Sequence, residues 1–198
     1  MNTKTKTKTT KLNFGCGDNI LKGWINHDQL LDGLDVRKAL PYNPNTAQYI
    51  FAEHLVEHLT CLEALAFLEQ CYQVLEPGGV IRVAIPDLAK IRKLDGSYEV
   101  FLNIETSFEG ITTKSRRDSM RLVLTHWGHK SFWTGELLAQ VLWIVGFEDL
   151  SFEEYGQSNH TELCDIDGHY KNHRLEEMYP GVSEICRKEV TTIEGVKK

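Results

Sequence analysis

The sequence predicts an α/β fold with a doubly wound, mostly parallel sheet of about seven strands. Short apolar runs bounded by Gly, Pro or acidic residues are typical of buried parallel strands. Four such runs are residues 12–14, 24–27, 48–52 and 80–85. One amphipathic helix lies between the third and fourth runs. Glycines or acidic residues follow the runs, and ligand-binding loops of such sheets are found at these positions.

The clearest helix spans residues 61–75. Its apolar residues recur at spacings of three and four, as expected for a helix with one buried face. They are Leu62, Leu65, Ala66, Leu68, Tyr72 and Leu75. Thr60 followed by Glu63 indicates a capping box, and Pro77-Gly78-Gly79 ends the element.

The remaining elements follow from shorter signals. A helix is expected after Asp87 up to about Leu94, and another over residues 134–145, capped by Thr134 and ended by Gly146. Residues 148–154 and 161–166 are interpreted as the sixth and last strands. Residues 167–198 are expected to cover the sheet edge or to close the active site.

Length and composition indicate one domain. Residues 1–10 alternate lysine with threonine and are predicted to be a disordered tail, which leaves residues 11–198 as the domain. Five scattered cysteines without C-x-x-C spacing indicate reduced thiols, and we predict a cytoplasmic protein with no membrane segment.

The charge balance disfavours a nucleic-acid partner. The formal net charge is −6 at pH 7, and a large nucleic-acid interface is basic. The one basic patch is interpreted as a solvated face, although a local binding role for it stays open. It consists of Lys114, Arg116, Arg117 and Arg121.

The first apolar run breaks into Gly15-Cys16-Gly17, a pattern that brings a backbone close to a nucleotide-like cofactor. Asp28 and Asp35 stand where the second and third strands should end, and a carboxylate there accepts ribose hydroxyls. An NAD fingerprint is incomplete, because Ile20 holds the third glycine position and Asp28 follows too soon.

In this region the chain resembles the class I S-adenosylmethionine-dependent methyltransferases, within them the small type 11-like enzymes, which have a Rossmann-like fold. The resemblance rests on five ordered motifs. They are Leu-Asn-Phe-Gly-Cys-Gly at 12–17, Asp28, Asp35-Val36-Arg37 before Leu40-Pro41, Ala-Glu-His-Leu-Val-Glu-His-Leu at 52–59, and Leu-Glu-Pro-Gly-Gly at 75–79. It implies S-adenosylmethionine as cofactor, held by Phe14, Gly15, Cys16, Gly17, Asp28, Asp35, Val36, Glu53 and His54.

Two departures from the family pattern are Asn13, which stands where many relatives carry an acidic or apolar residue, and the short segment after Gly17. Residues 17–24 leave room for only one or two helical turns, so the first crossover is expected to be a short helix or a loop. Residues 95–130 form an insertion after the fifth strand. We interpret it as a lid or substrate-binding segment, with a surface helical hairpin as an equal alternative.

The acceptor side is predicted from His126-Trp127-Gly128-His129 and Trp133. Aromatic faces hold sugars or planar rings, and a histidine accepts a proton near neutral pH. We predict His129 as the catalytic base and His126, Trp127 and Trp133 as substrate contacts, for a small-molecule or glycan acceptor. The alternative is that the tryptophans belong to the core and the histidines cap a helix.

Other interpretations stay open. His54-Leu55-Val56-Glu57-His58 matches the zinc-protease pattern H-x-x-E-H, but a long helix and a third ligand are not evident, and no metal ligand is predicted. The late histidines match no metal motif. The fold also serves S-adenosylmethionine lyases, hydrolases and non-catalytic subunits, and an NAD-dependent oxidoreductase is disfavoured. Phe132 and Trp133 are a candidate homodimer contact. The acceptor atom and the oligomeric state stay undetermined.

Overall fold

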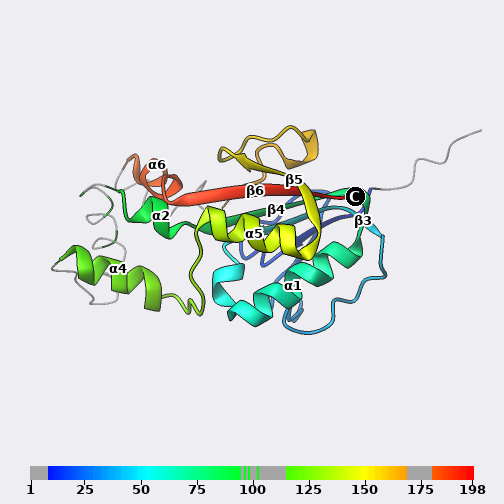
Figure 1. Cartoon of the computed structure of the whole chain (residues 1–198), viewed down its shortest axis with the longest axis horizontal. Coiled ribbons are helices and arrows are strands. Elements are labelled where there is room, and N and C mark those ends of the chain that lie inside the picture. The colour runs from blue at the N-terminus through cyan, green and yellow to red at the C-terminus, as the bar shows by residue number, and fades with distance from the viewer. Residues whose placement is uncertain (1–8, 95, 97, 99–101, 103–114, 169–179) are drawn as a thin grey trace, which may run out of the picture.

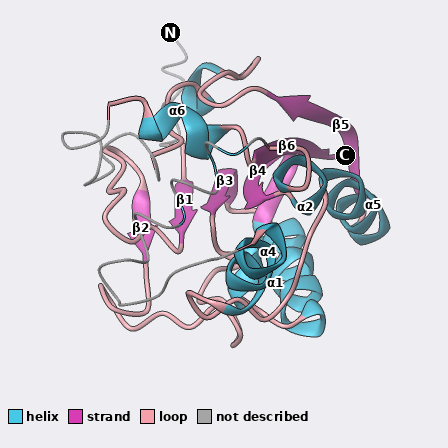
Figure 2. Cartoon of the chain, turned by 90° about the vertical axis from the view of Figure 1, so that its left-hand side faces the viewer, coloured by secondary structure: helices cyan, strands magenta, loops and turns pink. Residues whose placement is uncertain are grey.

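The computed structural model describes residues 9–94, 96, 98, 102, 115–168 and 180–198. Its centre is a six-stranded sheet of order β2-β1-β3-β4-β6-β5. The strands are β1 (Lys11–Phe14), β2 (Ile25–His27), β3 (Ala47–Glu53), β4 (Leu75–Pro86), β5 (Phe147–Glu153) and β6 (Val190–Lys197). The first four pair in parallel, and β6 runs antiparallel to both β4 and β5 (Figure 2).

Helices α1 (Cys61–Val74) and α5 (Gly135–Val145) lie on one face of this sheet (Figure 1). Their buried side chains pack against every second residue of the central strands, since successive strand residues point to opposite faces. The largest hydrophobic cluster therefore joins Phe67 and Leu138 to Ile50 and Ile81.

Local sequence explains where both helices begin and end. The Thr60 side chain accepts from the Glu63 amide, and the Glu63 carboxylate accepts from the Thr60 amide at 2.8 Å, which is the predicted capping box. Thr134 caps α5 in the predicted way, and Gly146 ends it with a φ of 117°. The predicted caps are confirmed. The predicted buried face of α1 is partly wrong, since Leu62 is 80% exposed and the helix buries Ala64, Phe67 and Cys71 instead.

The opposite face of the sheet is covered by residues 154–168, which follow β5 (Figure 1). Leu163 and Ile166 from this segment pack against Phe51 of β3 and Val80 of β4. Residues 161–166 were predicted to be the last strand, and this is wrong. Thr161–Leu163 is instead a 3₁₀ turn, η2.

A smaller cluster surrounds α2 (Leu88–Ile91), α4 (Arg116–Thr125) and α6 (Val182–Arg187). Asp87 fixes its position, because its Oδ1 caps α2 and its Oδ2 accepts from the Gly135 amide and the Thr191 hydroxyl. The insertion predicted over 95–130 contributes α4, and most of its residues before Ser115 lie outside the described part of the chain. So do residues 1–8 of the predicted tail.

The strand count differs from the prediction. No strand forms near Asp35, because residues 28–46, all of them described, make turns and loops. The shortened first crossover is confirmed, since residues 15–24 contain no helix. Residues 167–198 were expected to cover the sheet edge or to close the active site, but residues 190–197 form β6 inside the sheet.

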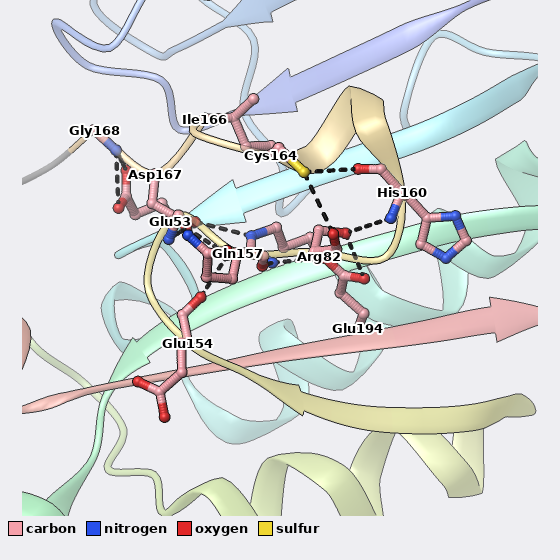
Figure 3. Close-up of polar contacts among 12 residues, drawn as sticks. Glu53, Arg82, Glu154, Gln157, His160, Cys164, Ile166, Asp167, Gly168 and Glu194 are labelled. Carbon is pink, nitrogen blue, oxygen red and sulfur yellow. Dashed lines mark hydrogen bonds and ion pairs between the residues drawn. The ribbon is translucent and has the colours of Figure 1, made fainter.

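A buried ion cluster joins the sheet to the covering segment (Figure 3). Arg82 of β4 is fully buried, and its guanidinium binds both oxygens of Asp167 and, at 2.6 Å, Glu194 Oε1 of β6. It also donates to the Gln157 carbonyl at 2.9 Å. Because such a charge is stable in the interior only when its donors are satisfied, this cluster fixes residues 154–168 against the sheet.

In the part of the chain that the structure describes, no helix combines the length and apolar character needed to cross a bilayer.

Replacing Arg82 should destabilise the protein severely. Arg82→Met leaves the Asp167 and Glu194 carboxylates buried without their cation, and removal of one partner from a buried ion pair costs about 3–5 kcal/mol in free energy of unfolding. Urea denaturation followed by circular dichroism measures this loss. The matched control is Arg117→Met on the exposed side of α4, which should change stability by less than about 0.5 kcal/mol. Equal effects of the two substitutions would contradict the structural role of Arg82.

Candidate active site

A cavity of about 920 Å³ opens at the carboxyl ends of β1 to β4. The chain leaves β1 toward β2 on one side and later returns to form β3 on the other, and ligands of α/β sheets bind at such a switch point. The volume suits a cofactor together with a small acceptor. The residues predicted to hold a cofactor that line it are Gly15, Cys16, Gly17, Asp28, Asp35, Val36, Glu53 and His54.

The loop after β1 needs glycine at its first position. Gly15 has a φ of 66°, and a Cβ built on it would lie 2.9 Å from Leu55 Cδ1. Gly17, with a φ of 46°, leaves open space where a side chain would stand. Both positions keep the backbone bare toward the cavity, so a ligand can lie against the main chain.

Side-chain amides that no sequence motif predicts hold this loop in place. Asn13 is 1% exposed, and its Nδ2 donates to the Asn19 carbonyl and to Asn26 Oδ1, both at 2.9 Å. Asn19 in turn donates to the Ile166 carbonyl at 2.9 Å and to Glu53 Oε2 at 3.3 Å. The departure from the family pattern at Asn13 therefore has a structural reason, since an apolar residue would remove the donor to the Asn19 carbonyl and leave Asn26 Oδ1 with the Leu21 amide alone.

Asp28 lies where the ribose-binding acid was predicted. Its Oδ1 accepts from the Leu30 amide at 2.8 Å, and its Oδ2 accepts from the Gly17 amide at 3.3 Å. The carboxylate thus bridges the loops after β1 and β2. Each carboxylate oxygen has a second acceptor site, so the group can still accept hydroxyls from a ligand in the cavity.

The Asp35 carboxylate forms an ion pair with Arg37. Arg37 Nε and one of its terminal nitrogens donate to the two carboxylate oxygens at 2.7 and 2.9 Å. The Arg37 hydrogen bond lowers the pKa of Asp35 to about 2. Asp35 therefore orders the loop that carries the buried Val36 to the cavity wall.

The turn after β3 is strained and buried. Glu53 is 7% exposed and accepts from the Gly168 amide at 2.9 Å. His54 has a left-handed φ of 49°, which a non-glycine residue adopts at an energetic cost and which is frequent at functional sites. Burial, helped by the nearby His129 and His58, lowers the pKa of His54 to about 3, so its ring is neutral at physiological pH.

A group of histidines faces the cavity beside this turn. The rings of His58 and His129 lie 5.0 Å apart at an angle of 80°, and both residues line the cavity with Trp127. His129 Nδ1 lies 2.8 Å from the Val123 carbonyl. A carbonyl only accepts, so Nδ1 carries the proton, and in the neutral ring the lone pair is on Nε2. Burial lowers the pKa of His129, which keeps that lone pair available at neutral pH.

Glu57 stands behind these rings. It is 2% exposed, and burial raises the pKa of its carboxyl. His54, Glu57 and His58 do not form the helical zinc-protease arrangement, because His54 precedes the short 3₁₀ turn η1 (Val56–His58) in a left-handed conformation. The pattern in the sequence therefore has a different geometry from the one that it resembles.

Three predicted site residues lie elsewhere. Phe14 is fully buried and stacks on His27 at 5.5 Å, within the core beneath the glycine loop. Trp133 is 3% exposed in the main hydrophobic cluster, with its indole N–H donating to Ser131. Trp133 is therefore a core residue in this structure, whereas its neighbour Phe132 is 43% exposed. His126 packs edge-on against Trp127 and is not among the lining residues.

The chain shares its fold with solved methyltransferase structures. A SAM-dependent methyltransferase from Archaeoglobus fulgidus is 17% identical, with a TM-score of 0.54, over 97% of this chain and 87% of that one. A SAM-dependent methyltransferase from Mesorhizobium loti is 11% identical, with a TM-score of 0.52, over 96% and 91%. Both alignments include almost the whole chain, so it has the Rossmann-like fold of class I methyltransferases.

A third similar structure is a Haemonchus contortus phosphoethanolamine N-methyltransferase in complex with phosphomonomethylethanolamine and S-adenosylhomocysteine. It is 13% identical, with a TM-score of 0.53, over 97% of this chain, which spans about half of that longer protein (49%). No protein-family model matches the sequence, and no curated protein matches it.

Alanine at Gly15 should disturb the loop at the cavity. Gly15→Ala combines a left-handed φ with a contact to Leu55, and strain of this kind costs about 1–3 kcal/mol. Thermal unfolding measures the cost. Gly96→Ala is the matched control, because Gly96 has no positive φ and no atom within 4 Å of its built Cβ. A neutral Gly15→Ala would show that the loop relaxes easily and does not depend on glycine.

Proposed function

We propose that this protein binds S-adenosylmethionine in the cavity and transfers its methyl group to an oxygen or nitrogen of a small-molecule or glycan acceptor. One observation carries the proposal. The glycine loop after β1, Asp28 after β2 and Glu53 at the end of β3, which the sequence motifs single out, line one cavity at the switch point of a class I methyltransferase fold.

Each part of the cofactor has a suitable partner in this arrangement. The bare backbone at Gly15 and Gly17 would accommodate the methionine part, and the Asp28 carboxylate would accept the ribose hydroxyls. The loop at Asp35 and Val36 would lie along the adenine. Glu53 and Asp28 supply negative charge, which favours a ligand that carries a sulfonium and an ammonium group.

The chemistry asks little of the protein beyond alignment. The acceptor atom attacks the methyl carbon as the carbon–sulfur bond breaks, the electron pair returns to sulfur, and S-adenosylhomocysteine leaves. Holding the two reactants in line therefore provides most of the acceleration, and a hydroxyl acceptor must also lose a proton. We propose His129, with its Nε2 lone pair beside the cavity, as the group that acts on the acceptor, and Trp127 as an acceptor contact.

Cofactor binding should depend on Asp28. Isothermal titration with S-adenosylmethionine and S-adenosylhomocysteine is expected to give micromolar-class binding, about −8 kcal/mol. Asp28→Asn removes the charge from the hydrogen bonds to ribose and should weaken binding about 10–100-fold. Asp149→Asn on the exposed start of β5 is the control, since asparagine also tolerates its positive φ. No binding of either ligand by the unchanged protein would refute the proposed cofactor.

Turnover should separate methyl transfer from the alternatives. With a panel of hydroxyl and amine acceptors, mass spectrometry should detect a methylated product together with S-adenosylhomocysteine. His129→Gln should lower kcat about 10²–10⁴-fold while cofactor affinity changes little. Release of methylthioadenosine without a methylated product would identify a lyase or hydrolase instead, and binding without turnover would indicate a non-catalytic subunit.

A further inference from the structure

Three potential metal ligands converge at the wall of the cavity. Glu57, His58 and His129 each offer one ligand atom, and these atoms all lie within 4.8 Å of one another. The main chain holds the two contributing segments together, because the Lys130 and Ser131 amides donate to the Glu57 carbonyl at 2.8 and 3.1 Å. The cluster is thus built by the fold, from residues some seventy positions apart in the chain.

The environment of the Glu57 carboxylate also favours a bound cation. It is 2% exposed, and neither of its oxygens has a hydrogen-bond donor among the residues that the structure describes. The closest approach of the neutral His54 ring is Nδ1 at 3.2 Å from Oε1, which supplies no positive charge to this carboxylate. Buried carboxylates are nearly always paired, hydrogen-bonded or bound to a metal, so this one requires an explanation.

The orientation of His129 fits a ligand role. Its Nδ1–H is held by the Val123 carbonyl, which leaves Nε2 as the atom that can bind. Metal-binding histidines commonly donate their other N–H to a carbonyl or carboxylate in this way, which fixes both the tautomer and the ring.

We propose that Glu57, His58 and His129 form a site for a divalent transition-metal cation of the zinc type. Two imidazoles and one carboxylate are a ligand set found in zinc sites that keep a fourth position open. Tetrahedral zinc spaces such atoms by about 3.3–3.5 Å, so they need to draw together by about 1.5 Å at most. His58 and His129 both line the cavity, which makes the open position accessible to a ligand there.

The cation would select acceptors that carry a metal-binding oxygen. This role of the cation rests on the proposed methyl transfer. An acceptor hydroxyl bound at the open position has a lowered pKa and releases its proton to solvent. The resulting oxygen then attacks the methyl carbon, and the electron pair of the carbon–sulfur bond goes to sulfur. His129 would thus act on the acceptor through the cation, and acceptors with a metal-binding oxygen would be favoured over simple amines.

The test is cation binding by the full chain, prepared free of metal and without S-adenosylmethionine. Co²⁺ absorption spectroscopy and Zn²⁺ titration should show one bound cation, with Zn²⁺ displacing Co²⁺. Glu57→Gln and His129→Gln should each weaken binding by more than the roughly 10–100-fold that partners of a metal ligand contribute. The control is His160→Gln, which alters a histidine packed on Tyr49 outside the cluster and should leave binding unchanged.

The proposed site would be refuted if the protein bound neither Zn²⁺ nor Co²⁺ stoichiometrically, or if it bound only Mg²⁺. It would also be refuted if the cluster variants bound these cations as tightly as His160→Gln. Circular dichroism of each metal-free variant shows whether weaker binding comes from loss of a ligand or from unfolding. His129 is less buried than Glu57, so His129→Gln is less disruptive to the fold than Glu57→Gln. Titration of S-adenosylmethionine in the presence of a chelator tests the cofactor independently, so either proposal can fail while the other stands.

Discussion

The buried charge of Arg82 is the constraint on which the rest of the structure depends. A guanidinium in the centre of a sheet is tolerated only if carboxylates and carbonyls reach it. Asp167 and Glu194 reach it from positions 85 and 112 residues away in the chain. Satisfying one side chain therefore determines where β6 enters the sheet and where the segment after β5 crosses its face (Figure 3).

The same network extends to the cavity through neighbouring residues. Gly168, next to Asp167, donates to Glu53, and Asn19 joins Glu53 to the Ile166 carbonyl. The glycine loop is thus connected to the ion cluster by partly buried hydrogen bonds, which are directional where apolar packing is not. This connection explains how a loop with few apolar side chains keeps a fixed shape at the mouth of the cavity.

Much of the fold could be predicted because it depends on local patterns. The helix from Cys61 to Val74 has a clear period and a capping box, and Gly146 ends α5 where a left-handed residue is required. A strand ending near Asp35 was predicted because an acidic residue at that place is typical of the family, and this strand does not form. Here the Arg37 side chain binds this acid within a turn instead.

The missed features depend on contacts between distant residues. The polar residues Thr191, Thr192 and Glu194 are typical of a surface strand, yet all three are buried in β6. Asp87 accepts a hydrogen bond from Thr191, and Arg82 donates one to Glu194. For the site, the motifs located the glycine loop and the acids correctly at the cavity. The meeting of Glu57 with His129 could not be predicted, since it results from the path of the chain through α4.

The position of β6 also affects the order in which the protein can form. Among the described strands, β5 pairs only with β6, and β6 lies between β5 and β4. During synthesis one edge of β4 therefore stays unpaired until residues 190–197 leave the ribosome. Arg82 lacks its Glu194 partner during the same interval. Open strand edges of this kind pair readily with other chains. The nascent protein thus carries an open strand edge at the centre of its own sheet until β6 pairs with β4.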